Sequence, residues 1–265
     1  AVVVIDADSA PSPNLLEACA ARLQQGAQAV QADYRVLNLE AAWRTRLMAI
    51  AMGAFHAARS RARERLGLSC GIRGNGWCIT HALLRQVPYQ AFSIVEDLEY
   101  GIDLGLAGQR VHYADEAWVK GEMVTGARAA RSQRRRWEQG RFALIRARAL
   151  PLLAAAVRRR SKVCLDLALD LLVLPLSNIA LGVAVITAVA TADAMLNGSA
   201  HGLWLAGFCA AGVACYVLRG WQLSGTGARG LLDLGAAPVF IVWKTALLLT
   251  TVRPGQWIRT QREDP

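Results

Sequence analysis

The chain has 265 residues, enough for one large domain or two small ones, and its 54% hydrophobic content with 19% charged residues is high for a wholly soluble protein. Charged residues concentrate before residue 163 and long apolar runs follow it, which is typical of a catalytic or binding domain followed by membrane segments. The net charge of +10 comes largely from arginine clusters beside those runs, a placement that suits anionic lipid and phosphate, so nucleic acid is excluded as an expected partner.

The first part of the chain alternates strand and helix patterns. Residues 1–5 are a continuous apolar, β-branched run, which predicts a buried parallel strand. The run begins in mid-strand without an initiator methionine, so we expect the chain to be a fragment of a longer protein. Helical patterns cover residues 14–25 and 40–66, and a second strand is predicted between them at 27–36.

Shorter elements follow the long helical pattern. After a glycine-rich loop the chain shows a short strand at 77–80, a loop entering a helix at 93–109, and short strands at 111–113 and 117–119. Alternation of strands and helices in this way predicts an α/β domain, which we assign to residues 1–150.

Residues 151–265 form the predicted membrane region. Residues 171–192 carry no charge and are long enough to span a bilayer, and residues 203–218 are shorter but also uncharged. Lysine and arginine flank this pair, whereas the loop between the two segments has neither, so both flanks are predicted to be cytoplasmic. A third apolar run at 231–252 contains Lys244 and is predicted to be an interfacial or re-entrant helix, with a third span as the alternative.

Two aspartates follow the first apolar run. Asp6 and Asp8 are two positions apart at the predicted end of a strand, so their side chains are expected to point to the same side. At the carboxyl edge of a parallel sheet that side faces the ligand crevice. Two close carboxylates suit Mg²⁺ or Mn²⁺ with a substrate diphosphate in the remaining coordination sites. The alternative is a surface turn that caps the following helix.

A second acidic group, Glu96 and Asp97, lies in the first turn of a predicted helix, where the helix dipole favours carboxylates. Asp97 is our candidate for a base that takes the proton of an alcohol, and a solvated, acid-rich helix start is the alternative. Asn75 lies between two glycines, a pattern that fits either a backbone segment close to a ligand or an ordinary turn.

The stretch at residues 131–141 reads RSQRRRWEQGR and predicts a helix. Gln133, Arg136 and Trp137 stand at i, i+3 and i+4, so they share one face of that helix. The guanidinium fork suits a carboxylate or phosphate, and the indole plate suits a sugar ring. A solvated basic helix with one partly covered tryptophan is the alternative.

The order of these motifs is informative. The chain has DAD at 6–8, GNG at 74–76, VEDLEYG at 95–101 and QRRRW at 133–137, followed by apolar helices. This order resembles the family 2 glycosyltransferases with a Rossmann-like GT-A fold, the membrane-bound group that includes the cellulose, hyaluronan and poly-N-acetylglucosamine synthases. The resemblance covers nearly the whole chain, and it implies that an amino-terminal part of the catalytic domain, which binds the nucleotide base, is missing here.

The resemblance also implies roles for single residues. Asp6 and Asp8 match the motif that holds a metal and the nucleotide diphosphate, and Asp97 matches the general base. The residues that match those holding the diphosphate and the acceptor sugar are Asn75, Glu96, Gln133, Arg136 and Trp137.

The expected function is therefore inverting, metal-dependent sugar transfer from a nucleotide sugar, with a UDP-sugar as the first choice, to a polysaccharide or lipid acceptor. We expect a multi-pass protein of a bacterial inner membrane that contacts lipid and an export or assembly subunit, with its catalytic domain in the cytoplasm. One alternative is a membrane-anchored, non-catalytic assembly protein of the same fold. Another is a haloacid-dehalogenase-type phosphatase with Asp6 as nucleophile, but Ala10 stands where that pattern usually has Thr or Val.

Overall fold

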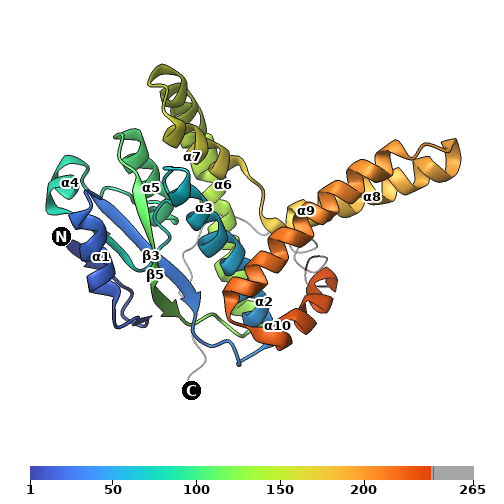
Figure 1. Ribbon diagram of the computed structural model, residues 1–265, viewed down its shortest axis with the longest axis horizontal. Helices are drawn as coiled ribbons and strands as arrows, with labels where there is room; N and C mark the ends of the chain where they lie inside the picture. The colour runs from blue at the N-terminus through green and yellow to red at the C-terminus, as the bar shows by residue number, and fades with distance from the viewer. Residues whose placement is uncertain (240, 242–265) are drawn as a thin grey trace.

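A computed structural model describes residues 1–239 and 241 of the chain, apart from the side chains of residues 127–136 (Figure 1). At its centre is a five-stranded mixed sheet with the strand order β1-β4-β3-β5-β2. The strands are β1 (Val2–Val4), β2 (Ala10–Pro11), β3 (Ala29–Val36), β4 (Trp77–Ile79) and β5 (Val111–Gly121). Strands β3 and β5 run parallel along the whole of β3, and the other pairs are antiparallel.

Alternation along β3 places its side chains in two hydrophobic cores, one on each face of the sheet. Ala29 lies in the core that α5 (Glu96–Leu106) and α4 (His81–Gln86) cover, whereas Val30 lies in the core that α1 (Leu15–Gln24) covers. The predicted α/β class is confirmed, as are the predicted strand at 27–36 and the helix at 14–25.

Two strand predictions were wrong. The apolar run at 1–5 is a half-buried strand that pairs antiparallel with β4 at the edge of the sheet formed by the described residues. An apolar sequence indicates that both faces of a strand are covered. It does not determine whether the neighbouring strand runs parallel or antiparallel. The expected strands at 111–113 and 117–119 are one strand, because β5 continues past a register shift opposite Ala32 and Asp33 of β3.

The helical pattern at 40–66 is one continuous rod made of α2 (Trp43–Met52), a π-helical turn η1 (Gly53–Ala58) and α3 (Arg59–Arg65). The other α-helices of the described residues are α6 (Ala127–Arg158), α7 (Lys162–Leu172), α8 (Leu176–Asn197), α9 (His201–Ser224) and α10 (Gly227–Asp233). Helix α6 passes without a break through residue 150, where the domain boundary is predicted, so that boundary stays a prediction.

Helices α8 and α9 form a hairpin that extends away from the sheet (Figure 1). Both are long and apolar enough to cross a membrane, with mean hydropathies of 2.0 and 1.6, and little of either helix is buried in the protein. The first helix begins after Pro175 rather than at residue 171 as predicted, because α7 takes up residues 162–172. Most of the predicted segment at 231–252 lies outside the described residues.

Close backbone contact joins α9 to the rod at η1. A Cβ atom on Gly220 would lie 2.6 Å from the carbonyl oxygen of Ile50, and one on Gly53 would lie 2.4 Å from the carbonyl oxygen of Gly220. Glycine at both positions is what allows the two helices to touch through their backbones.

We expect Gly220→Leu to destabilise the protein by about 1–3 kcal/mol, because the added side chain has no space and must force α9 away from η1. Gly212→Leu on the same helix is the matched control, since nothing lies within 4 Å of a Cβ atom there. Thermal unfolding in detergent would compare the two variants, and equal melting temperatures would contradict the close contact.

Candidate active site

The two predicted metal-binding aspartates lie in a tight turn after β1. The backbone N–H of Ser9 donates to the carbonyl oxygen of Asp6 at 3.0 Å, which closes residues 6–9 into that turn. Strand β1 ends at Val4, so the predicted position of Asp6 and Asp8 at the end of a strand was wrong, whereas the direction of their side chains stays a prediction.

A single buried amide clamps this turn. The backbone N–H of Asp6 donates to Oδ1 of Asn75 at 3.1 Å, and Nδ2 of Asn75 donates to Oγ of Ser9 at 2.6 Å. Both ends of the Asn75 amide thus bind the turn, and Asn75 is only 1% exposed. The Gly-Asn-Gly segment is therefore hydrogen-bonded to the Asp6 turn, although Asp6 and Asn75 are 69 residues apart in the sequence.

The loop that carries Asn75 also reaches Asp97. Gly74 and Gly76 both have positive φ angles, and a Cβ atom on Gly76 would lie 2.5 Å from Cγ2 of Val119, so the backbone passes closely over β5. A Cβ atom on Gly74 would lie 3.5 Å from Oδ2 of Asp97. One loop thus brings the Asp6 turn and Asp97 to the same edge of the sheet.

Asp97 is the second residue of α5 and is half-buried. Burial raises the pKa of its carboxyl group above the usual value, and the neighbouring Glu96 carboxylate raises it further. The backbone N–H of Leu98 and the charge of Arg73 act in the opposite direction. A carboxylate with a raised pKa is a stronger base, which is the property that the predicted role of Asp97 requires.

Tyr34 belongs to this group of residues, and it is not among the predicted site residues. Burial raises the pKa of its hydroxyl group, the carboxylates of Asp6 and Asp97 raise it further, and a hydrogen bond with the Asn75 side chain lowers it. Room for the hydroxyl group is left by Gly121, where a Cβ atom would lie 2.6 Å from that oxygen. Nothing in the sequence of β3 marks it out, because Gln31, Asp33 and Arg35 are also polar residues of that strand.

Helix α6 lies against the start of α5. A Cβ atom on Gly140 would lie 2.9 Å from Cγ1 of Val95, the residue that precedes Glu96, so the two helices approach closely there. Trp137, one turn earlier on α6, is 40% exposed. The backbone confirms the predicted helix at residues 131–141, whereas the side chains of Gln133 and Arg136 lie outside the described residues.

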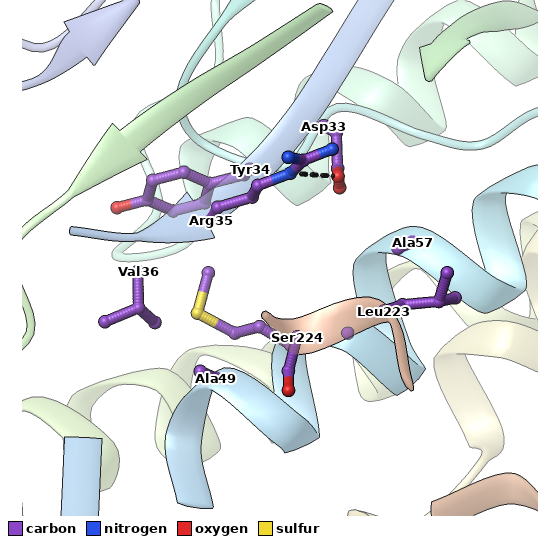
Figure 2. Close-up of a pocket in the computed structure, with 10 residues that line it drawn as sticks. Asp33, Tyr34, Arg35, Val36, Ala49, Ala57, Leu223 and Ser224 are labelled. Carbon is purple, nitrogen blue, oxygen red and sulfur yellow. Dashed lines mark hydrogen bonds and ion pairs between the residues drawn. The ribbon is translucent and has the colours of Figure 1, made fainter. Parts of the chain in front are cut away.

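A small pocket lies beside this group, where β3 meets α2 and the end of α9, and Tyr34 is one of its lining residues (Figure 2). At its rim Nε of Arg35 donates to Oδ2 of Asp33 at 2.7 Å, and Ala49, Met52 and Leu223 contribute apolar surface. None of the predicted site residues lines this pocket. The candidate active site is therefore the edge formed by the Asp6 turn, the Asn75 loop and the start of α5.

The donor groups at this edge fit a divalent cation that is shared with a substrate. Among the described residues, no three His, Cys, Asp or Glu side chains are grouped so that they could hold a metal by themselves. Mg²⁺ usually takes one or two protein carboxylates and completes its coordination with water and substrate phosphates. Asp6 and Asp8 could supply that smaller set.

Comparisons with known proteins agree with this geometry. The family model described as "Glycosyl transferase family group 2" matches residues 1–226. Over 143 residues the chain is 28% identical to the "Probable glucomannan 4-beta-mannosyltransferase 14" of Arabidopsis thaliana. The matched region covers 52% of this chain and 26% of that protein. The chain therefore matches about a quarter of the length of this curated relative.

Proposed function

The chain belongs to glycosyl transferase family group 2, and from this premise we propose that it is a glycosyltransferase that moves a sugar from a nucleotide-sugar donor to a saccharide or lipid acceptor, with inversion at the anomeric carbon. The loop at residues 73–76 supports this proposal most strongly. Its Asn75 holds the Asp6 turn and its Gly74 lies beside Asp97, so one segment joins the proposed diphosphate site to the proposed base.

In the proposed reaction Asp97 accepts the proton of the acceptor hydroxyl group while that oxygen attacks the anomeric carbon from the face opposite the nucleotide. The bond between the anomeric carbon and the diphosphate oxygen breaks, and the diphosphate leaves with the electron pair. Asp6 and Asp8 would hold Mg²⁺ or Mn²⁺, which when bound supplies positive charge next to the leaving diphosphate. Arg136 would add a guanidinium group to the same oxygens.

The acceptor is proposed to bind between α6 and the start of α5. The contact of Gly140 with Val95 supports this position, because it brings α6 next to Glu96 and Asp97. The exposed indole of Trp137 offers a flat apolar surface for a sugar ring, and Gln133 would bind its hydroxyl groups. A saccharide acceptor fits this combination of an aromatic plate with hydrogen-bonding groups.

We further propose that α8 and α9 cross a membrane and that the catalytic domain is cytoplasmic. The length and composition of the two helices support this, as do Arg219 and Arg229 near the end of α9 that joins the catalytic domain. An acceptor carried by a lipid, or a growing polysaccharide, would then reach the site from the membrane side.

Nucleotide release tests the proposal. The full-length protein in membranes would be supplied with UDP- and GDP-sugars, Mg²⁺ or Mn²⁺, and lipid and oligosaccharide acceptors. Release that requires both the metal and Asp97 is the expected result, and the active sugar would identify the donor. Absence of release with every sugar would favour the non-catalytic assembly protein, and a phosphoryl group trapped on Asp6 would favour the phosphatase.

Asn75→Ala is expected to lower kcat/KM for the donor by about tenfold or more, because the Asp6 turn loses its clamp and a buried polar contact is left incomplete. Asn38→Ala is the matched control: the Asn38 amide also makes two hydrogen bonds, at 2.8 and 2.9 Å, but both are with the backbone of Met123. The measurement is steady-state kcat/KM for the donor in both variants, with the larger loss expected in Asn75→Ala. Equal losses would show that Asn75 acts only through general stability.

A further inference from the structure

The carboxyl-terminal end of α7 is held by an arginine from α6. The guanidinium group of Arg141 donates to the carbonyl oxygens of Asp170 at 2.5 Å, Leu171 at 3.1 Å and Val173 at 2.6 Å. Carbonyl groups at a helix end have no partner within the helix, and a cation there also complements the helix dipole. Arg141 is four residues after Trp137, so the two lie one turn apart on the same helix.

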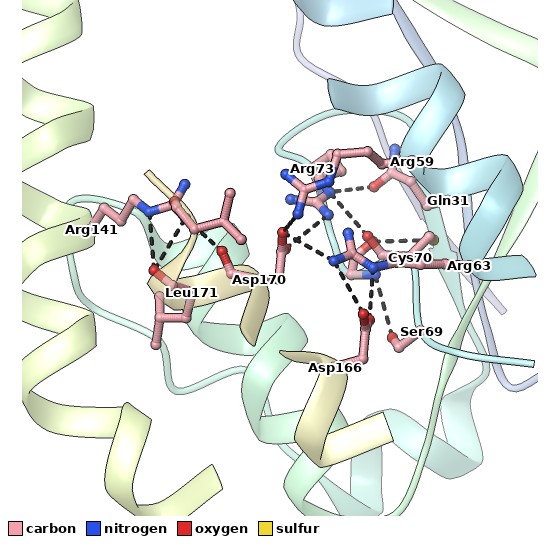
Figure 3. Close-up of polar contacts among 12 residues, drawn as sticks. Gln31, Arg59, Arg63, Ser69, Cys70, Arg73, Arg141, Asp166, Asp170 and Leu171 are labelled. Carbon is pink, nitrogen blue, oxygen red and sulfur yellow. Dashed lines mark hydrogen bonds and ion pairs between the residues drawn. The ribbon is translucent and has the colours of Figure 1, made fainter. Parts of the chain in front are cut away.

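The same end of α7 presents a buried carboxylate to three arginines (Figure 3). The side chain of Asp170 is 6% exposed and pairs with Arg59, with Arg63 at 3.1 Å and with Arg73 at 3.3 Å. Burial alone would raise the pKa of the Asp170 carboxyl group, but the three guanidinium groups outweigh it and hold that pKa well below its usual range.

Arg73 carries this contact into the active-site loop. Its backbone N–H donates to Oε1 of Gln31 at 2.8 Å, and its Nε donates to the carbonyl oxygen of Cys70 at 3.0 Å. The amide of Gln31 in turn donates to the carbonyl oxygen of Asn75 at 2.7 Å. Gly74 and Asn75 follow Arg73 directly, so the position of the Arg73 side chain fixes where the loop begins.

We propose that Asp170 and Arg141 are positioning residues of the transferase site. Through Arg73 the end of α7 fixes the loop that contacts Asp97, and through Arg141 it fixes the helix that carries Trp137. Both halves of the site are therefore set by one short segment, residues 170–173. Only Leu174 and Pro175 separate that segment from α8, so the site is also tied to the apolar hairpin. That these residues position a transferase site rests on the proposed function. That residues 170–173 anchor the loop at 73–76 and helix α6 does not.

The test compares Asp170→Asn with Asp166→Asn. Asp166 is also on α7 and pairs with Arg63 at 2.7 Å, so each variant loses an ion pair between α3 and α7, but only Asp170 contacts Arg73. Hydrogen exchange of the full-length protein in detergent is measured on peptides that cover residues 70–76. We expect exchange there to quicken by about tenfold or more in Asp170→Asn, and to stay close to that of the unaltered protein in Asp166→Asn.

Turnover is measured on the same two variants. A loss of kcat of about tenfold or more is expected for Asp170→Asn alone, since small displacements of reacting groups are costly. Equal exchange at residues 70–76 in both variants would overturn the proposal, whether or not any sugar is transferred. If exchange quickens in Asp170→Asn but the unaltered protein transfers no sugar, the anchoring of the loop is supported and the proposed function is not.

A pH profile separates positioning from general destabilisation. The charge of Arg73 lowers the pKa of Asp97; on the described residues the other ionisable groups that face this carboxyl are Glu96, Tyr34 and Tyr89. A base works only when deprotonated, so activity falls as pH drops through its pKa. Arg73→Gln should therefore move the acid limb of kcat/KM to higher pH, and Arg73→Lys should leave it in place. An unmoved limb in Arg73→Gln would exclude this electrostatic effect of the loop on the base.

Discussion

Asparagine in place of Asp97 is expected to lower kcat by about 10²–10⁴-fold, the usual contribution of a proton-accepting side chain, while the donor still binds. The amide has nearly the shape of the carboxylate, so the packing against Gly74, whose Cβ atom would lie 3.5 Å from Oδ2, should persist. What is lost is the ability to accept the proton of the acceptor hydroxyl group. Initial rates of nucleotide release, with donor binding measured by calorimetry, give both quantities.

Asp103→Asn is the matched control for this substitution. Asp103 lies on the same helix and pairs with Arg148 at 3.3 Å, away from the Asn75 loop. Its loss should change stability slightly and turnover little, as is common for partly exposed ion pairs. Normal turnover in Asp97→Asn would remove Asp97 as the base and direct attention to Glu96 and Tyr34.

The second large effect is expected at the Asp6 turn. Replacing both Asp6 and Asp8 by asparagine should lower turnover by about 10³-fold or more, since metal stabilisation of a leaving group is worth several kcal/mol and 1.36 kcal/mol is tenfold. The turn itself should survive, because Asn75 and Ser9 bind it through the backbone N–H and carbonyl oxygen of Asp6.

Mn²⁺ binding to the protein with a nucleoside diphosphate, followed by electron paramagnetic resonance, measures this loss without turnover. Asp115→Asn serves as the control, because Asp115 is an acidic residue on β5 that pairs with Arg61 at 3.1 Å. Reversible loss of activity on chelation is expected for the unaltered protein. Full activity in the presence of a chelator would exclude the metal and leave Arg136 as the main proposed source of positive charge at the diphosphate.

Local patterns in the sequence predicted the elements of this fold well, but not how the strands pair. Helix periodicity and glycine loops are local, so the rod at 40–66 and the start of α5 before Asp97 could be read from the chain. The direction of β1 and the continuity of β5 depend on partners that are distant in sequence. The early end of β1 at Val4 also moved Asp6 and Asp8 from a strand into a turn.

The residues that hold the site together were harder to predict than those that are proposed to act in it. Gln31 and Asp170 are buried polar residues, and a buried polar group must find partners. That pattern indicates a network but does not name its members, because Arg73 and Asn75 lie more than 40 residues from Gln31. The roles of Gln133 and Arg136 stay predictions from the motif alone.

The π-helical turn Gly53–Ala58 has a consequence for which changes in length the chain can tolerate. Such a turn holds one more residue than the same stretch of α-helix. One residue corresponds to a rotation of about 100° around the helix axis. Removing a single residue from α2 would therefore rotate Arg59 and Arg63 by about that angle, away from Asp170. Removing one from η1 would instead convert that turn to ordinary α-helix and keep the two arginines in phase with Asp170. Between the crossing at Gly53 and the first arginine of α3, the loss of one residue can therefore be absorbed, whereas in α2 an insertion or deletion changes the phase of the helix.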